Sequence, residues 1–383
     1  MPAGGNWKEM FHAAENGDLE LVRYHLSTGI DPNYQHPEYS TGALLESVRK
    51  GHLDIVELLL ENGAKPDIVK DFGTETPMSI AVAQNNKAAI FLLNKYLPEE
   101  LHNHQYGTRK KVVVTGGNRG IGRAIAKQLL EAGHEVVIVA RNEEQGNAVV
   151  AELKLETKNP DIQLLKGDLS SIETCNRLVE ALKSEHSDMD VLINNAGVWM
   201  MDRELNEDGL EKTFMVNYLA PYILCKELFS TLKQNQPARI VNVNSGLYVT
   251  GKLDIEKTPY GLDFGKIKTY ANSKFCNMLF NIDFAKEIEG SGVTLNAVHP
   301  GVIKTGLGDS SSFLSRIVKF TKRFWKAPEQ GAVAPVWLAL SEELEGVHGN
   351  YYNEKTLEAL KDTVQDEELR AAFRLKTEEI LGR

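Results

Sequence analysis

The chain has 383 residues, a length typical of two or three folding units rather than of one compact domain. Hydrophobic residues make up 42% and charged residues 25%, which excludes a largely disordered chain. The net charge of -10 excludes a broad basic surface, so we expect no nucleic-acid partner. The three cysteines, Cys175, Cys225 and Cys276, lie far apart in the sequence. Scattered cysteines are typical of a reducing compartment, so we expect neither disulfides nor a metal site.

Membrane segments are not predicted either. No stretch approaches the roughly 18 apolar residues of a membrane-spanning helix. Residues 1–18 also lack the basic and apolar regions of a signal peptide. We therefore expect a soluble, cytoplasmic protein without a membrane span.

An internal repeat opens the chain. Residues 17–22 (Gly-Asp-Leu-Glu-Leu-Val) recur 34 residues later as 51–56 (Gly-His-Leu-Asp-Ile-Val), and a weaker third copy begins near Asn85. These segments resemble ankyrin repeats, which implies stacked helix–turn–helix units over residues 1–97. Residues 1–107 hold 15 acidic and 8 basic side chains, so the array presents an acidic surface. It either binds a protein partner or packs on the neighbouring domain.

A polar stretch over residues 98–110 opens with Pro98 and is predicted to be a linker. Its two histidines, His102 and His104, have no other ligand at metal-binding spacing, so we expect them to be solvated.

Short β-branched runs alternate with helical stretches from residue 111 to the end. Val112-Val113-Val114 is continuous rather than alternating, as in strands covered by helices on both faces. Residues 111–383 are therefore predicted to form an α/β domain, a doubly wound Rossmann-like parallel sheet preceded by the small all-α ankyrin-repeat array. The predicted strands are 111–115, 135–140, 162–167, 191–194, 239–244 and 294–299.

The first of these strands leads into a glycine-rich loop, residues 115–122 (Thr-Gly-Gly-Asn-Arg-Gly-Ile-Gly), and then a helix. Glycines at 116, 120 and 122 let the backbone approach a pyrophosphate, whose charge meets the free N–H groups of the helix. The spacing differs from Gly-x-Gly-x-x-Gly and points to another family.

Further motifs follow in a fixed order. Asn194-Asn195-Ala196-Gly197 ends the fourth strand, Ser245 ends the fifth, and Tyr270 stands four residues before Lys274. With Asn217, Pro300 and Gly301, residues 110–353 resemble the short-chain dehydrogenase/reductase family. Residues 239–245 and 298–302 are similar to its retinol dehydrogenase and carbonyl reductase branch. Some members of that branch carry an N-terminal membrane anchor, whereas ankyrin-like repeats occupy that end here.

The catalytic residues follow from this resemblance. Tyr270 and Lys274 share one helix face, so the ammonium, aided by the positive nicotinamide of the oxidised cofactor, is expected to lower the pKa of the phenol. Tyr270 is then the general acid for reduction and the base for oxidation. Lys274 also hydrogen-bonds the nicotinamide ribose, Ser245 holds the substrate oxygen, and Asn217 helps to order a water beside Lys274.

The cofactor is predicted to be NADP(H). The second strand ends at Ala140 and Arg141 without the carboxylate of NAD-selective folds, so Arg141 and Arg119 can bind a 2′-phosphate. The alternative is that Arg141 merely begins a solvent-facing helix. Asp168 is expected to contact the adenine, or to cap a helix. Further expected cofactor contacts are Gly116, Asn118, Gly120, Ile121, Gly122, Leu169, Asn195, Ala196, Gly197, Tyr270, Lys274, Pro300, Gly301, Val302 and Thr305.

Substrate contacts are expected from loops at the carboxyl ends of the strands. Residues 246–269 are predicted to flank the substrate, and the basic, aromatic residues 310–325 to form a lid; a membrane, an acidic partner or the repeats are alternative contacts for that segment. The apolar candidates, each of which could instead belong to the core, are Trp199, Met200, Met201, Leu247, Tyr248 and Phe264.

Together these features predict an NADP(H)-dependent oxidoreductase that transfers hydride between nicotinamide and a carbonyl or alcohol carbon of an apolar small molecule. The alternative is an NADPH-sensing scaffold with little turnover. The resemblance also allows a homodimer through the helix that bears Tyr270 and Lys274. The sequence does not give the substrate, the partner of the repeats or the oligomeric state.

Overall fold

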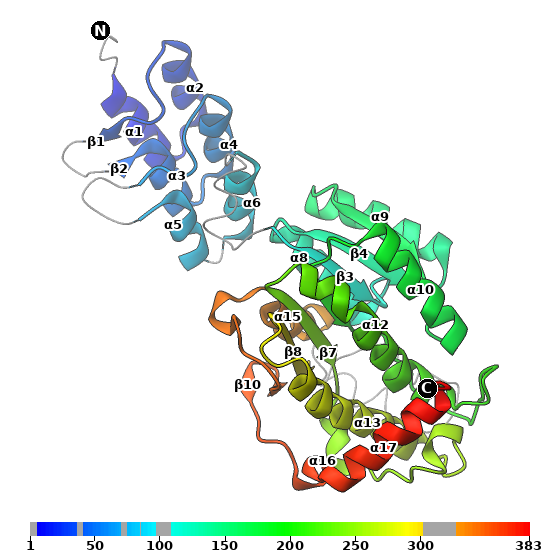
Figure 1. Ribbon diagram of the computed structural model, residues 1–383. Helices are drawn as coiled ribbons and strands as arrows, with labels where there is room; N and C mark the ends of the chain where they lie inside the picture. Colours follow the sequence, from blue (N-terminus) through cyan, green and yellow to red (C-terminus); the bar gives the residue numbers. More distant parts are fainter. Residues whose placement is uncertain (1–5, 37–40, 70–74, 85, 97–108, 302–326) are drawn as a thin grey trace. The chain divides into compact units, whose positions relative to one another are not determined.

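The computed structural model describes residues 6–36, 41–69, 75–84, 86–96, 109–301 and 327–383 (Figure 1). The chain divides into two compact units, one of residues up to Arg109 and one of nearly all residues from Lys110 onward. Residues 98–108 of the predicted linker lie outside the described part, as do Val302, Thr305 and residues 310–325.

The first unit consists of helix pairs. Gly17 and Gly51 end the first helices of two successive pairs, both with φ of +81°, a conformation that favours glycine. The first helices of successive pairs pack on one another, and so do the second helices. This confirms the predicted helical array, with one addition: a short antiparallel pair, β1 (Gln35–His36) and β2 (Thr41–Gly42), precedes the second pair of helices. The helices are α1 (Trp7–Asn16), α2 (Leu19–Ser27), α3 (Ala43–Lys50), α4 (Leu53–Glu61), α5 (Pro77–Ala83) and α6 (Lys87–Tyr96).

The second unit is built on an eight-stranded sheet in the order β10-β9-β8-β7-β6-β3-β4-β5 (Figure 1). All neighbours are parallel except β9 and β10, so the doubly wound fold is confirmed. The strand order reverses between β3 and β6, and open α/β sheets bind ligands at such a point. The strands are β3 (Lys111–Thr115), β4 (Glu135–Ala140), β5 (Ile162–Lys166), β6 (Val191–Asn194), β7 (Ala238–Val243), β8 (Val293–His299), β9 (Tyr351–Asn353) and β10 (Thr356–Leu357).

Helices cover both faces of this sheet, which explains the continuous valine runs: Val112, Val113 and Val114 are all fully buried. One core contains side chains of α8, α9 and α15, and the other those of α10, α12 and α13. These helices are α8 (Gly120–Glu131), α9 (Glu143–Thr157), α10 (Ile172–Glu185), α12 (Ala220–Gln234), α13 (Lys266–Glu287) and α15 (Pro328–Leu340). Shorter elements are α11 (Lys212–Phe214), η1 (Met215–Leu219), η2 (Gly246–Thr250), η3 (Thr258–Tyr260), η5 (Glu342–Leu344) and α16 (Asp362–Gln365).

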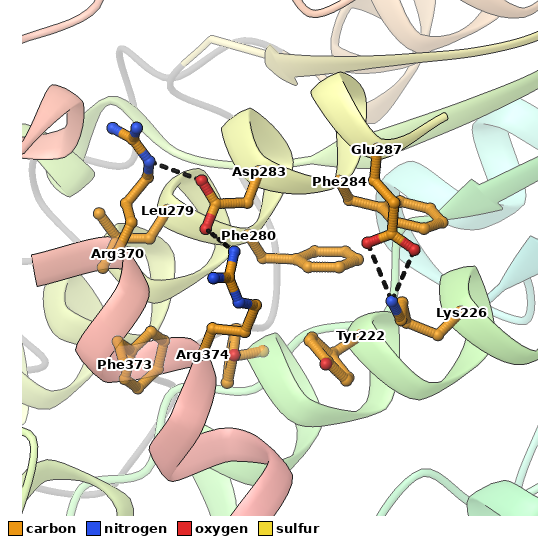
Figure 2. Close-up of a pocket in the computed structure, with 11 residues that line it drawn as sticks. Tyr222, Lys226, Leu279, Phe280, Asp283, Phe284, Glu287, Arg370, Phe373 and Arg374 are labelled. Atoms are coloured by element: carbon orange, nitrogen blue, oxygen red, sulfur yellow. Dashed lines mark hydrogen bonds and ion pairs between the residues drawn. The ribbon is translucent and has the colours of Figure 1, made fainter. Parts of the chain in front are cut away.

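The C-terminal helix α17 (Glu367–Ile380) packs against α12 and α13. Phe373 is 2% exposed and contacts the rings of Phe214 and Tyr218, while Arg370 forms an ion pair of 2.6 Å with Asp283. Figure 2 shows a pocket between the three helices, to which none of the predicted site residues contributes. Since α17 covers part of the face that the resemblance gives to a homodimer, that dimer stays a prediction.

Removing the ring of Phe373 tests the packing of α17. Phe373→Ala leaves a cavity between α17 and the π-helical turn η1, so we expect the free energy of unfolding to fall by about 3–5 kcal/mol. Leu375→Ala is the matched control, because Leu375 lies on the same helix but is 69% exposed, and it should cost less than about 0.5 kcal/mol. Urea unfolding followed by tryptophan fluorescence measures both changes. Equal losses would contradict the packing described.

Candidate active site

The glycine-rich loop lies between β3 and α8, as predicted. Gly116 has a φ of +66°, and a Cβ added there would lie 3.0 Å from the Cα of Ala196. A Cβ on Gly122 would lie 2.2 Å from the carbonyl oxygen of Gly116, so any side chain at position 122 would clash with the backbone. The first turn of α8 begins at Gly120 and includes Ile121, so its free N–H groups and positive dipole end can hold a pyrophosphate.

The loops that follow β3 and β6 are joined at the switch point. The Thr115 hydroxyl oxygen accepts hydrogen bonds from the backbone N–H groups of Asn195 and Ala196, each at 3.0 Å. The side-chain amide of Asn195 donates to the carbonyl of Thr115 at 2.8 Å. The two segments that the sequence assigns to the cofactor therefore lie side by side.

Two arginines stand beside this loop without acidic partners. Arg119 lies in the loop next to Asn118, and Arg141 follows β4; both arginines are exposed. Neither arginine forms an ion pair in the described part of the chain. Lys166, by contrast, is paired with Glu143. Both guanidinium groups are therefore free to bind an anion.

Asp168 does not cap helix α10, which corrects one alternative. Its carboxylate accepts a hydrogen bond from the backbone N–H of Ser170 at 3.0 Å, whereas Ser171 is the N-cap and accepts from Thr174. The neighbouring Leu169 is 9% exposed. Asp168 thus stabilises the turn after β5, where an adenine contact remains a prediction.

Tyr270, Ser245 and Lys274 come together at the carboxyl end of β7. The Ser245 hydroxyl lies beside the Tyr270 phenol and favours the ionised form of that phenol. The amine of Lys274 donates to the carbonyl of Val243 at 3.0 Å and lies 5.9 Å from the centroid of the Tyr270 ring. Helix α13 therefore supplies the predicted phenol and amine, and the N-cap of η2, two residues after the end of β7, supplies the serine.

Asn217, a predicted site residue, lies beside this group. It belongs to the π-helical turn η1, and this turn was not predicted from the sequence. Its amide oxygen accepts from the N–H of Val198 at 2.8 Å, and its amide nitrogen donates to the Val198 carbonyl at 2.9 Å and to the Ser273 hydroxyl at 3.0 Å. A Cβ on Gly197 would lie 3.4 Å from the Asn217 amide oxygen and 3.9 Å from the Lys274 amine. Gly197 therefore lies next to both the Asn217 amide and the Lys274 amine.

A sequence signal for the π-helical turn does exist. In a regular α-helix the carbonyl of Asn217 would accept from the N–H of residue 221, but Pro221 has none. Asn217 followed by a proline four residues later thus indicates a carbonyl that needs another donor.

Burial sets the ionisation of the central pair. It raises the pKa of the Tyr270 phenol above its ordinary value, and the Ser245 hydroxyl offsets part of this increase. It also lowers the pKa of the Lys274 amine to about 8. In the cofactor-free protein the pKa of the phenol is therefore raised rather than lowered, because desolvation is the largest effect on it. The lowering expected with an oxidised cofactor bound stays a prediction.

Trp199 covers the ring of Tyr270. The two rings are stacked with centroids 4.9 Å apart, and the indole N–H donates to the Lys266 carbonyl at 2.6 Å. Met200 and Met201 are partly exposed beside it. Leu247 and Phe264 are also partly exposed, and both stay predicted pocket residues.

Tyr248 is instead part of the core. It is 2% exposed, and the centroid of its ring lies 5.0 Å from that of Tyr351, so its expected role as a pocket residue is wrong. The reason is that the short helix η2 turns it inward.

The segment after β8 is described only in its first residues. Pro300 is buried, and Gly301 has a φ of +88°, where a Cβ would lie 2.7 Å from the carboxylate of Glu354. In the described part of the chain, no group of three or more His, Cys, Asp and Glu side chains could hold a metal ion. None of the helices described there is both long and apolar enough to cross a membrane.

Comparison with known proteins agrees with this geometry. The family model of short chain dehydrogenases matches residues 110–312, and the model of ankyrin repeats, in three copies, matches residues 10–102. Retinol dehydrogenase 12 of Mus musculus is 35% identical over 64% of this chain and 78% of its own length. Retinol dehydrogenase 13 of Mus musculus is 34% identical over 70% of this chain and 82% of its own length.

Solved structures share the fold. One is described as a gluconate 5-dehydrogenase from Beutenbergia cavernae with bound NADP; it is 26% identical, has a TM-score of 0.50, and the match covers 64% of this chain and 94% of that one. A blue fluorescent protein in complex with NADPH, from a metagenomic library, is 24% identical with a TM-score of 0.52, over 64% of this chain and 95% of that one. The chain belongs to the short-chain dehydrogenase/reductase family of NAD(P)-dependent oxidoreductases, and it carries N-terminal ankyrin repeats.

Proposed function

We propose that the protein is an NADP(H)-dependent oxidoreductase that acts on a carbonyl or alcohol group of an apolar small molecule. The observation that carries this proposal is the grouping of Tyr270, Ser245 and Lys274, in which the Lys274 amine lies 5.9 Å from the centroid of the phenol ring. A protein that only senses NADPH needs no proton donor at this position.

The cofactor preference rests on charge. The end of β4 presents Arg141 where NAD-selective folds have a carboxylate, and Arg119 stands in the loop after the neighbouring strand β3. A guanidinium group binds phosphate through two parallel hydrogen bonds, and neither arginine is committed to a carboxylate of the described chain. Two of the structural neighbours contain NADP or NADPH, which supports the same choice.

Each residue of the site has a distinct task. When bound, the nicotinamide supplies or accepts the hydride. For reduction, Tyr270 donates its hydroxyl proton to the substrate oxygen while Ser245 holds that oxygen by a hydrogen bond; for oxidation, Tyr270 removes the alcohol proton. Lys274 hydrogen-bonds the ribose and attracts negative charge on the phenol, and Asn217 fixes the loop beside Gly197.

An apolar substrate suits the surroundings of the phenol. Trp199 stacks on Tyr270, and Met200 and Met201 follow it in the chain, so a substrate that reaches the hydroxyl contacts an aromatic and sulfur-containing surface. The similar retinol dehydrogenases are named for an apolar alcohol, which supports the same substrate class.

The ankyrin repeats are proposed to bind a protein partner or to pack on the enzyme unit. Their acidic composition favours a basic surface in either case. We also propose a cytoplasmic location, because three cysteines that form no disulfide suit a reducing compartment.

Substituting the phenol tests the proton donor. Tyr270→Phe removes the hydroxyl, so NADPH-dependent carbonyl reduction should fall by a factor of about 10²–10⁴ while the Kd for NADPH changes less than about threefold. Tyr352→Phe is the matched control and should keep full turnover, because Tyr352 is a buried strand residue outside the site. Normal turnover in Tyr270→Phe would contradict the proposed role. No turnover of the wild type on an aldehyde and ketone panel, despite NADPH binding, would favour the sensing scaffold.

Reversing one charge tests the cofactor preference. Arg141→Asp removes a phosphate ligand and adds a hydrogen-bond acceptor, so kcat/KM for NADPH should fall by about 10- to 100-fold and the value for NADH should not. Arg177→Asp serves as the control, since Arg177 is an exposed surface residue of α10. An unchanged ratio of the two kcat/KM values in Arg141→Asp would show that Arg141 does not select the cofactor.

The lowered pKa of Lys274 predicts a pH dependence. The amine is protonated below pH about 8 and loses its charge above it. The phenol stays protonated over this range because its pKa is raised. The kcat/KM for NADPH, which reports ionisations of the free enzyme, should therefore fall as the pH rises through about 8.

Lys274→Arg keeps its charge at every pH of that experiment, so any remaining activity should lose this decline. A wild-type profile that stays flat from pH about 6 to 10 would contradict the pKa assigned to Lys274.

A further inference from the structure

Four asparagine side chains form a continuous chain of hydrogen bonds inside the second unit. Asn194 donates to Asn242 at 2.8 Å, Asn242 donates to Asn281 at 2.6 Å, and Asn281 donates to Asn277 at 3.0 Å. Asn277 in turn donates to the backbone carbonyl of Asn217 at 3.3 Å. We call Asn194, Asn242, Asn281 and Asn277 the amide chain.

Every member of the amide chain is at most 4% exposed. Burying an amide costs free energy unless its hydrogen bonds are made, and leucine or methionine would fill the same volume without that cost. Each amide N–H in the chain points to the oxygen of the next residue, so the four dipoles are aligned and strengthen one another. Such an arrangement indicates a requirement for position rather than for stability.

Both ends of the amide chain lie in the active site. Asn194 is the last residue of β6 and immediately precedes Asn195, Ala196 and Gly197. Asn277 lies on α13, three residues after Lys274. The last acceptor is the carbonyl of Asn217, which Pro221 leaves without its α-helical donor.

Asn217 transmits this constraint to the cofactor side. Its side chain makes two hydrogen bonds with the backbone of Val198, one donated and one accepted. A displacement of the π-helical turn therefore displaces the loop at Gly197, against which the Lys274 amine lies.

We propose that Asn277, supported by Asn281 and Asn242, is a positioning residue that fixes Asn217 and the loop at Gly197 for hydride transfer. The proposal rests on the proposed oxidoreductase function for its kinetic consequence. Asn277 and Asn281 act through Asn217 and touch neither the substrate nor the cofactor.

The kinetic test breaks the amide chain at two points. Asn277→Leu removes the donor to Asn217, and Asn281→Leu breaks the link before it. We expect kcat for NADPH-dependent reduction to fall about tenfold in Asn277→Leu and less in Asn281→Leu, with KM for NADPH within about twofold of the wild type. Asn277→Ala takes the place of Asn277→Leu if the larger side chain prevents folding.

Asn159→Leu is the matched control. Asn159 is 7% exposed and its amide binds the carbonyls of Leu130 and His134, so its loss lowers the melting temperature without touching the amide chain. A kcat that falls in proportion to the melting temperature in all three variants, the control included, would overturn the proposal.

A second readout does not depend on turnover. Hydrogen–deuterium exchange of the peptide that contains Met215–Leu219 should accelerate in Asn281→Leu, although the hydrogen bonds described for Asn281 join it to Asn242, Asn277 and Met278, and should not change in Asn159→Leu. Unchanged exchange at Met215–Leu219 in Asn281→Leu would overturn the positioning role. Absence of turnover in the wild type would instead refute the proposed function, and the exchange experiment would still decide the positioning role.

Discussion

The burial of polar groups on helix α13 is the constraint on which the site depends. This helix packs against the sheet with Ser273, Lys274 and Asn277 buried, and each of these side chains needs a hydrogen-bond partner. The partners are the carbonyl of Val243 for Lys274 and the π-helical turn for Ser273 and Asn277. The same contacts that satisfy the helix therefore bring β7, the turn at Asn217 and the loop at Gly197 to one place.

The same burial leaves the protein incomplete without its cofactor. Desolvation stabilises the neutral forms of both Tyr270 and Lys274, so the pair resists the charges that proton transfer requires. A positively charged nicotinamide ring would favour the phenolate form of Tyr270, and the ribose hydroxyls would favour the ammonium form of Lys274. Arg119 and Arg141, which have no acidic partner in the described chain, would meet the phosphates of the same molecule. Binding of NADP(H) and acquisition of catalytic charge are thus expected to be one event.

Much of the fold follows from local pattern. The short apolar runs give the six central strands to within about a residue at each end, and in β3 and β4 these runs are continuous because buried parallel strands need no polar face. Strands β9 and β10 are only three and two residues long, which is too short for any periodicity to show. The glycine-rich loop is recognised from its place between a strand and a helix, and Ser245, Tyr270 and Lys274 from the resemblance of their motifs to those of the family.

Features that depend on long-range contacts cannot be predicted from local sequence patterns. The inward side chain of Tyr248, the raised pKa of Tyr270 and the packing of α17 on α12 and α13 all follow from burial by distant segments. The amide chain joins residues from 194 to 281 and has no local pattern. The π-helical turn is the exception, because Pro221 marks it in the sequence.

Burial holds the Tyr270 phenol neutral, and the bound cofactor is expected to make it acidic. An NMR pH titration of protein labelled with ¹³C at the tyrosine ζ-carbon, with and without NADP⁺, measures the pKa of this phenol directly; the spectrum of Tyr270→Phe identifies its signal. The account predicts a pKa above the ordinary tyrosine value in the free protein and a marked fall when NADP⁺ binds. A pKa that is already low without the cofactor, or that does not fall on binding, would contradict it.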